Sequence, residues 1–228
     1  QAQIYVRLKK ALYGTLKAAL LFWKKLSKSL TDAGFTINEC DWCVANKMVN
    51  GKQCTIVWHV DDLKISHVDP TVVTEIIEML KCKYGKVGEL NVVRGKKHEY
   101  LGIDLDFSSP NKVIISMQQY IDRILDEVPE DMKGTATSPA ADHLFKTRDD
   151  GTKLDSETAD TFHHIVAQLL FVCKRARPDI QTAIAFLCTR VKSPDDDDYK
   201  KLSRVIRYLR RTKFLRLTLE ADNLNRVE

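Results

Sequence analysis

The sequence predicts an α+β protein in which an antiparallel sheet with packed helices is followed by a unit built from helices. Up to residue 128, β-forming runs separated by turn residues alternate with helical periodicity, whereas only helical periodicity follows residue 153. Between them, 129–153 is rich in turn-forming residues and is long for a loop inside one compact unit. We therefore expect a first domain at 1–128, a linker at 129–153 and a helical region at 154–228.

Composition sets the broad class of the protein. The 228 residues are 44% hydrophobic, with a net charge of +5 and a pI near 8.8, so a polyanionic partner is allowed but not required. No apolar run approaches the roughly 18 residues of a membrane span, and there is no signal-peptide pattern. Cys40 and Cys43 form a lone CxxC without a second pair, so the six cysteines are expected to be reduced thiols of an intracellular protein.

The first predicted element is a helix over 9–33. Apolar residues recur at steps of three and four, at Leu12, Leu16, Leu20, Trp23, Leu26 and Leu30. Gly34 provides a stop signal. A basic stripe lies on the other side, at Lys10, Lys17, Lys24 and Lys28. The stripe is either a solvated face of an amphipathic helix or a track for phosphates, and the pattern does not decide between them.

Two hairpins are expected within 35–66. Asn50-Gly51 is a strong hairpin signal between two runs of β-formers. The second run, 54–60, is interrupted by Asp61-Asp62 and resumes at 63–66, which indicates a tight hairpin with carboxylates at its tip. Adjacent carboxylates repel one another and are a good pair of ligands for Mg²⁺ in phosphoryl transfer. An ordinary Asp-rich turn is the alternative on spacing alone.

The remaining elements follow from caps and periodicity. Asp69-Pro70 opens a helix that glycines at 85 and 88 end, with Asp69 as the cap. Later elements are expected as strands at 98–107 and 112–117, with a turn at 108–111 between them, and helices at 118–127, 156–175, 179–191 and 194–211. The acidic run 195–198 is typical of a helix N-terminus, with Ser193 as the expected cap, and not of a metal site.

The last helix carries one-sided positive charge. Lys200, Arg204, Arg207 and Arg211 fall on one face, and no acid occurs between residues 199 and 219. Contact with a nucleic-acid backbone is the natural interpretation, and a solvated face is the alternative.

Several segments together resemble the copia-type retrotransposon reverse transcriptase family. In chain order they are Leu8-Lys9-Lys10-Ala11-Leu12-Tyr13-Gly14 followed by Trp23, His59-Val60-Asp61-Asp62, Tyr100-Leu101-Gly102-Ile103, Arg177-Pro178-Asp179-Ile180, and Arg207-Tyr208-Leu209-Arg210-Arg211-Thr212. The second is similar to the Tyr-x-Asp-Asp box of reverse transcriptases. Order and spacing agree over nearly the whole chain, which makes the set far more specific than any one motif.

The resemblance implies an RNA-directed DNA polymerase, with a partial palm of a right-hand polymerase at 1–128 and a helical thumb or connection region at 154–228. Asp61 and Asp62 would be the catalytic residues and bind Mg²⁺. The nucleotide and primer end would lie near Tyr13, Gly14, His59, Leu101 and Gly102. Template–primer contacts would come from Lys17, Lys24, Lys200, Arg204, Arg207 and Arg211.

The implied partners are an RNA or DNA template–primer, deoxynucleoside triphosphates and the rest of a polyprotein. No membrane partner is expected, and the implied location is intracellular, in a cytoplasmic particle or the nucleus. A non-catalytic remnant that binds nucleic acid through its basic helices is the alternative function.

The sequence departs from the family pattern at several points. The family's other catalytic aspartate lies upstream of the Leu-Tyr-Gly segment, so we expect a fragment that lacks one metal ligand and has little activity alone. His59 stands where the family has Tyr. Thr15-Leu16-Lys17-Ala18-Ala19 replaces a Leu-Lys-Gln-Ala-Pro stretch, so nucleotide selection by that Gln does not carry over. The chain stops where a ribonuclease H domain would start, so no RNA cleavage is expected.

Overall fold

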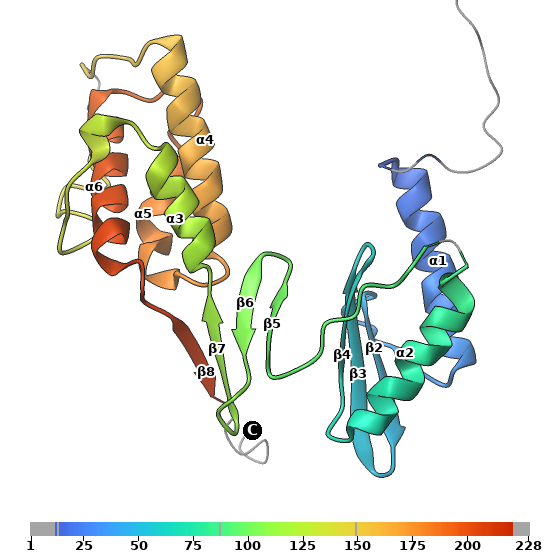
Figure 1. Ribbon diagram of the computed structural model, residues 1–228. Coiled ribbons are helices and arrows are strands. Elements are labelled where there is room, and N and C mark those ends of the chain that lie inside the picture. Colours follow the sequence, from blue (N-terminus) through green and yellow to red (C-terminus); the bar gives the residue numbers. More distant parts are fainter. Residues whose placement is uncertain (1–11, 13, 87, 149, 221–228) are drawn as a thin grey trace, which may run out of the picture. The chain divides into compact units, whose positions relative to one another are not determined.

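The computed structural model describes residues 12, 14–86, 88–148 and 150–220. The chain divides into two compact units, Gln1–Val92 (unit 1) and Val93–Glu228 (unit 2), shown in Figure 1. The described residues contain two antiparallel four-stranded sheets and six α-helices, which confirms the mixed α+β prediction. The division near residue 92 differs from the predicted domains 1–128 and 154–228, and the palm and thumb assignments stay predictions.

Unit 1 is one sheet with two helices. Its elements are α1 (Leu16–Asp32), β1 (Thr36–Ile37), β2 (Val44–Val49), β3 (Lys52–His59), β4 (Asp62–Ser66) and α2 (Pro70–Tyr84). The strands lie in chain order, each antiparallel to the next. Asn50 and Gly51 both have positive φ between β2 and β3, which confirms the hairpin predicted from the Asn-Gly pair.

Both helices of unit 1 pack on the same face of its sheet. The shared core contains Leu26 and Leu30 from α1, Cys54, Ile56 and Trp58 from β3, and Val72, Ile76 and Leu80 from α2. The Asp69 carboxylate caps α2 by accepting a hydrogen bond from the Thr71 amide at 2.8 Å, as predicted. Strand alternation therefore leaves every second residue of β3 on the opposite face, which no described helix of this unit covers.

Helix α1 is shorter and less buried than predicted. It begins at Leu16, because Thr15 has extended backbone angles and its hydroxyl caps the Ala18 amide. Residues 9–11 and 13 of the predicted helix lie outside the described residues. Leu12, Leu16 and Leu20 belong to the predicted apolar stripe but are 59%, 92% and 51% exposed. Only the second half of the predicted apolar stripe contacts the sheet.

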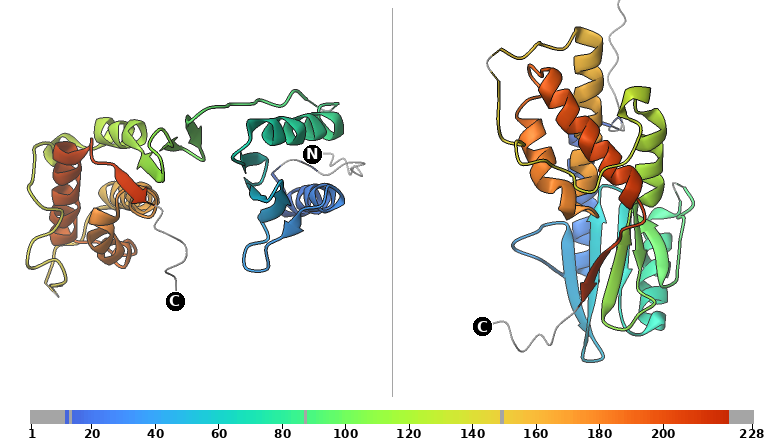
Figure 2. Two further views of the ribbon diagram at one scale, coloured as in Figure 1. Left: turned by 90° about the horizontal axis from the view of Figure 1, so that it is seen from below. Right: turned by 90° about the vertical axis from the view of Figure 1, so that its left-hand side faces the viewer.

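Unit 2 joins a second sheet to a group of helices. Its elements are β5 (Lys97–Tyr100), β6 (Ile103–Asp106), β7 (Lys112–Ser116), α3 (Gln118–Glu127), the 3₁₀ turn η1 (Glu130–Met132), α4 (Ser156–Cys173), the 3₁₀ turn η2 (Pro178–Ile180), α5 (Gln181–Cys188), α6 (Asp196–Thr212) and β8 (Leu217–Glu220). Figure 1 and the right-hand view of Figure 2 show that the helices gather at one end of this sheet. Ile103 and Ile115 from the sheet pack against the helical core.

Two predictions about the strands of unit 2 were wrong. The expected strand 98–107 is a hairpin of β5 and β6, because Leu101 and Gly102 both have positive φ and form a two-residue turn. The chain after residue 153 is not all helix, since β8 pairs with β7 and completes the sheet. Alternation of Leu217 and Leu219 with polar residues is the signal that indicates this strand.

The predicted linker 129–153 belongs to unit 2 and packs on α6. Met132 is fully buried in the helical core, and Leu144 is 6% exposed. Lys153 forms an isolated β-bridge with Asp195. Asp195 is also the N-cap of α6, in place of the predicted Ser193, and forms a capping box with Asp198. The acidic run therefore serves as a helix cap, as the sequence indicated.

Two further observations concern the cysteines and the possibility of membrane-spanning helices. All six cysteines are free. None of the helices in the described part of the chain is both long and apolar enough to cross a membrane.

Candidate active site at the hairpin between β3 and β4

The predicted acidic pair lies at the tip of the β3–β4 hairpin, as the sequence indicated. His59 and Asp62 are cross-strand partners, so Val60 and Asp61 are the two central residues of the turn. Val60 has a φ of 54° and Asp61 has no positive φ, which is the pattern of a type II′ turn. The side chains of all four residues are exposed. The carboxylates are therefore held at the end of a regular strand pair and are open to solvent.

The turn carries local backbone strain. A β-branched residue is disfavoured at positive φ, and a type II′ turn usually has glycine at this position. Val60 nevertheless occupies it, and its side chain is 46% exposed, so little burial offsets the cost. Such conformations are concentrated at functional sites.

Strand alternation places part of the site on the open face of the sheet of unit 1. Trp58 is buried against the helices, and its neighbour His59 and the facing Asp62 therefore point to the opposite face. Further along this face, Asn46 and Thr55 are directly opposed, and the Thr55 hydroxyl donates to the Asn46 amide oxygen at 2.8 Å. Val57 and its cross-strand partner Val44 lie on the same face between this polar pair and His59, so the face is of mixed character and ends at one of the two carboxylates.

The electrostatics of the hairpin leave the acidic pair uncompensated. The carboxylates of Asp61 and Asp62 form no hydrogen bond or ion pair with a residue that the structure describes. Lys64, two residues along β4, donates to the Ser66 hydroxyl at 3.3 Å, and burial lowers the pKa of its ammonium group. Neighbouring carboxylates without a cation repel each other, and a hard divalent cation relieves that repulsion.

The two carboxylates fit a magnesium ion in part. Their oxygens are the hard ligands that Mg²⁺ prefers, and their exposure leaves room for the water and phosphate ligands that usually complete its shell. Within the described ranges there is no group of three or more His, Cys, Asp or Glu side chains arranged to hold a metal. Asp61 and Asp62 therefore offer two carboxylate ligands to such an ion, and its remaining ligands would have to come from elsewhere.

The residues predicted near the nucleotide and primer are dispersed over the chain. Tyr13 lies outside the described residues. Gly14 has a φ of +84° and is exposed just before α1. His59 is exposed at the end of β3, opposite Asp62. Leu101 and Gly102 form the turn between β5 and β6 in unit 2.

The predicted basic contacts divide into two kinds. Lys17 and Lys24 are exposed on α1 and bind no other described side chain. On α6, Arg204 donates to the Ser138 hydroxyl at 3.0 Å, and Arg207 donates to the carbonyls of Lys133 and Asp131 at 3.0 and 2.8 Å.

The α6 residues therefore do not form a freely solvated stripe. Lys200 pairs with Asp196 at 2.8 Å, and Arg211 is exposed without such a contact among the described residues. Much of this basic face holds the 129–153 segment in place.

A buried ion pair forms within the segment Arg177-Pro178-Asp179-Ile180, which the sequence marked only by its resemblance to the family. Arg177 is 1% exposed and binds both carboxylate oxygens of Asp179, at 2.9 and 2.7 Å. It also donates to the carbonyl and hydroxyl of Thr212 at the end of α6. The sequence signal for this ion pair is an Arg placed two residues before an Asp, with a Pro between them. That signal does not reveal the contact with Thr212, which is distant in the chain.

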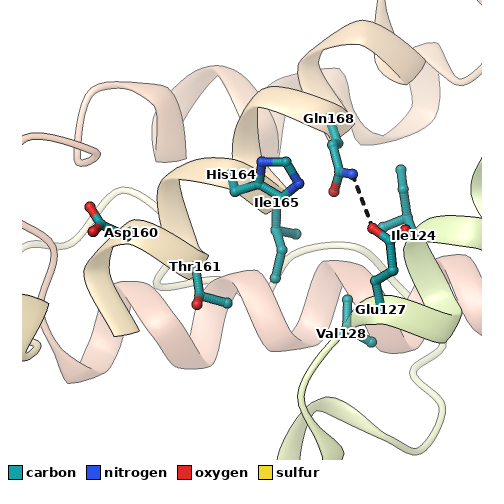
Figure 3. A pocket seen from close by; sticks show the side chains of 8 residues that line it. All are labelled: Ile124, Glu127, Val128, Asp160, Thr161, His164, Ile165 and Gln168. Carbon is teal, nitrogen blue, oxygen red and sulfur yellow. Dashed lines mark hydrogen bonds between the residues drawn. The ribbon is translucent and has the colours of Figure 1, made fainter. Parts of the chain in front are cut away.

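A cavity of about 380 Å³ lies between α3 and α4, as Figure 3 shows. Glu127 of α3 accepts a hydrogen bond of 3.5 Å from Gln168 of α4, and the His164 ring lies beside Gln168. Ile124, Val128 and Ile165 provide apolar walls, and Asp160 and Thr161 add polar ones. The cavity lies wholly in unit 2 and contains none of the predicted site residues.

Comparison with known proteins decides the family. Residues 1–141, which are 141 of the 228, match the family described as reverse transcriptase (RNA-dependent DNA polymerase). The chain belongs to this family. The matched range includes the whole β3–β4 hairpin, and the resemblance to copia-type reverse transcriptases is confirmed.

Curated relatives extend the match beyond the family range. A putative transposon Ty5-1 protein of Saccharomyces cerevisiae is 26% identical over 204 residues, or 89% of this chain and 63% of that protein. The retrovirus-related Pol polyprotein from transposon RE1 of Arabidopsis thaliana is 27% identical over 89% of this chain and 13% of its own length. The corresponding polyprotein from transposon TNT 1-94 of Nicotiana tabacum is 22% identical over 90% of this chain and 16% of its own length.

The chain thus spans under two thirds of the yeast relative and a small part of the polyproteins. No solved structure was found to match it.

Proposed function

We propose that the chain supplies part of the polymerase site of a copia-type reverse transcriptase, with Asp61 and Asp62 as ligands of catalytic Mg²⁺. The observation that carries the proposal is the pair of exposed, uncompensated carboxylates on a strained hairpin turn. It occurs inside the range that matches the reverse transcriptase family. The reaction is transfer of a deoxynucleotide to the 3′-hydroxyl of a primer paired to an RNA or DNA template.

The chemistry assigned to the hairpin follows from its charge and exposure. Mg²⁺ held there would stabilise charge on the phosphoryl oxygens and lower the pKa of the primer hydroxyl. The protein's part is to hold two carboxylates in a fixed relation at the end of paired strands, so that little reorganisation is needed at the moment of reaction. His59, across from Asp62 at the end of β3, is proposed to lie beside the reacting groups in place of the family's Tyr.

Unit 1 is proposed as part of the palm, because two helices cover one face of its antiparallel sheet and the other face, which ends at Asp62, is left for the primer–template. Lys17 and Lys24 are proposed to contact backbone phosphates, and Tyr13 and Gly14 to lie near the incoming nucleotide. Leu101 and Gly102 are proposed to lie near the primer end. The helices of unit 2 are proposed as the thumb or connection region.

The test is primer extension by a polypeptide that carries this chain together with the segments encoded beside it. Asp61→Asn and Asp62→Asn should each lower the rate at least about a hundredfold, because a metal ligand contributes several kcal/mol to charge stabilisation. Glu75→Gln, which neutralises an exposed carboxylate on α2, is the matched control and should leave the rate unchanged.

Binding of a labelled primer–template, measured beside extension, distinguishes the polymerase from a non-catalytic nucleic-acid-binding remnant. A nucleic-acid-binding remnant and a polymerase both bind the duplex in a salt-sensitive manner. Only the polymerase loses extension in the Asp61 and Asp62 variants while binding persists. Full extension by Asp61→Asn would remove the catalytic assignment and leave the binding function.

A further inference from the structure

A second cavity, of about 510 Å³, lies between the 135–144 segment and α6. Its walls are fixed by contacts between these two parts of unit 2. Arg207 donates to two carbonyls, Arg204 donates to the Ser138 hydroxyl, and the Ala136 amide donates to the Arg207 carbonyl at 3.2 Å. Lys201 donates to the carbonyl of Lys146 at 2.6 Å. The cavity is therefore built by tertiary structure and is not a gap beside a loose loop.

The positive charges that line the cavity are only partly paired with carboxylates of the described chain. Lys200 pairs with Asp196, and Lys201 pairs with Asp197, both at 2.8 Å. The three lining arginines, at positions 204, 207 and 211, form no ion pair with a carboxylate of the described chain, and no acid lines the cavity. Their spacing of three and four residues places them on one side of α6. Three guanidinium groups gathered without a counter-charge favour a bound anion.

The donor set of the cavity suits a phosphate group. Guanidinium groups bind phosphate oxygens through paired, charge-assisted hydrogen bonds, and they stay charged at any physiological pH. The Nε atom of Arg204 is buried and has no hydrogen-bond acceptor, so one donor of the cluster is unsatisfied. Thr135 and Thr137 add hydroxyl groups to the opposite wall.

We propose that this cavity is a discrete phosphate-binding site on α6. It refines the nucleic-acid contact expected of α6, since binding is assigned to the residues of one cavity and not to a stripe along the helix. The phosphate is either a diester of a nucleic-acid backbone or a free phosphate compound, because both present the same oxygens. The site lies in unit 2 and does not use Asp61 or Asp62, so it can fail or stand without the polymerase assignment.

The proposal is tested by isothermal titration calorimetry of the 228-residue chain at low salt. One probe is an eight-nucleotide oligothymidylate without terminal phosphates, and the other is inorganic pyrophosphate. Arg211→Gln should weaken binding about tenfold, the usual effect of one charge-assisted hydrogen bond. The fold should survive, because Arg211 is exposed and binds no other described residue. Lys192→Gln removes an equal charge from an exposed position outside the lining and should change affinity less than about twofold.

Each outcome decides the proposal. Arg211-dependent binding of the oligonucleotide supports the site with a backbone diester, and Arg211-dependent binding of pyrophosphate alone supports it with a free phosphate. Equal weakening by Lys192→Gln would show diffuse attraction and overturn it. If neither probe binds at concentrations up to about 10 mM, the proposal is overturned as well. Asp61→Asn should bind like the wild type, so loss of extension and loss of phosphate binding are distinguishable.

Discussion

Replacing Arg177 by Met should destabilise unit 2 by about 3 kcal/mol. The guanidinium donates to both oxygens of Asp179 and to the carbonyl and hydroxyl of Thr212, at 2.7 to 3.0 Å. Its side chain is 2% exposed, and that of Asp179 is 32% exposed. Removing one partner of a buried ion pair costs about 3–5 kcal/mol, and partial solvent access to Asp179 selects the lower end. Met keeps most of the buried length, so the loss is mainly polar.

Urea unfolding of the 228-residue chain measures this effect in one unit. All three tryptophans, Trp23, Trp42 and Trp58, belong to unit 1, so their fluorescence follows that unit alone. Far-ultraviolet circular dichroism also follows the helices of unit 2. With a slope of about 2 kcal/mol/M, the dichroism midpoint of unit 2 should fall by roughly 1.5 M urea. The fluorescence midpoint should stay where it is in the wild type.

Lys174→Met is the matched control because Lys174 is an exposed cation three residues away. Such surface changes usually alter stability by less than about 0.5 kcal/mol. A dichroism midpoint for Arg177→Met equal to that of Lys174→Met would refute the reasoning. Asp179→Asn combined with Arg177→Met should cost less than the sum of the single changes, since both remove the same interaction.

Acid provides a second check on the same interaction. Burial alone would raise the pKa of Asp179, but the hydrogen bonds and charge of Arg177, with the Tyr208 hydroxyl, hold that pKa below its ordinary value. A carboxyl with a lowered folded-state pKa stabilises the protein above its unfolded pKa of about 3.9, and the stabilisation is lost as pH falls through the folded value. The gap between wild type and Arg177→Met should therefore narrow below about pH 4.

Three smaller predictions concern turns. Val60→Gly should stabilise unit 1 by about 1 kcal/mol, because glycine tolerates the positive φ at this exposed position. The urea midpoint of tryptophan fluorescence measures the gain, and an unchanged midpoint would show that Val60 is not strained. Leu101→Asn should stabilise unit 2 by about 1 kcal/mol, because Asn-Gly suits a turn with two positive φ angles. Leu101→Ala is the control, and an equal gain in that variant would show that the turn preference of Asn is not the cause. Hydrogen bonds from Ser108, with Lys97, lower the pKa of Asp106 to about 2, so its carboxyl NMR titration should reach its midpoint there and move up in Ser108→Ala.

The features that local chemistry specifies were predictable from the sequence. Asn50-Gly51 gives a type I′ hairpin because both residues tolerate positive φ. Asp69-Pro70 begins α2, since the Asp side chain caps an amide and Pro suits the first helical turn. Helix α3 spans 118–127, as its periodicity predicted. In each case the determining residues are neighbours in the chain.

The features that depend on distant partners were not predictable. Periodicity shows that one side of α1 is apolar, but not that Leu16 would be 92% exposed while Leu26 is buried. Composition suggested a linker at 129–153, because Pro, Gly and Asp mark irregular chain whether or not it packs on a helix. Arg207 was expected to be solvated or to contact phosphate, yet its acceptors are carbonyls about 75 residues earlier.

If the proposed function holds, the exposure of the acidic pair makes folding and catalysis separable at this site. Water screens the repulsion between Asp61 and Asp62, so the hairpin does not require a cation in order to form. Neither carboxylate bonds to a described residue, and removing its charge therefore breaks no internal contact. Asp61→Asn should then lower extension at least about a hundredfold, while leaving the tryptophan-fluorescence transition of unit 1 within about 0.5 kcal/mol of the wild type. A polymerase defect accompanied by unfolding would instead assign these carboxylates a structural role.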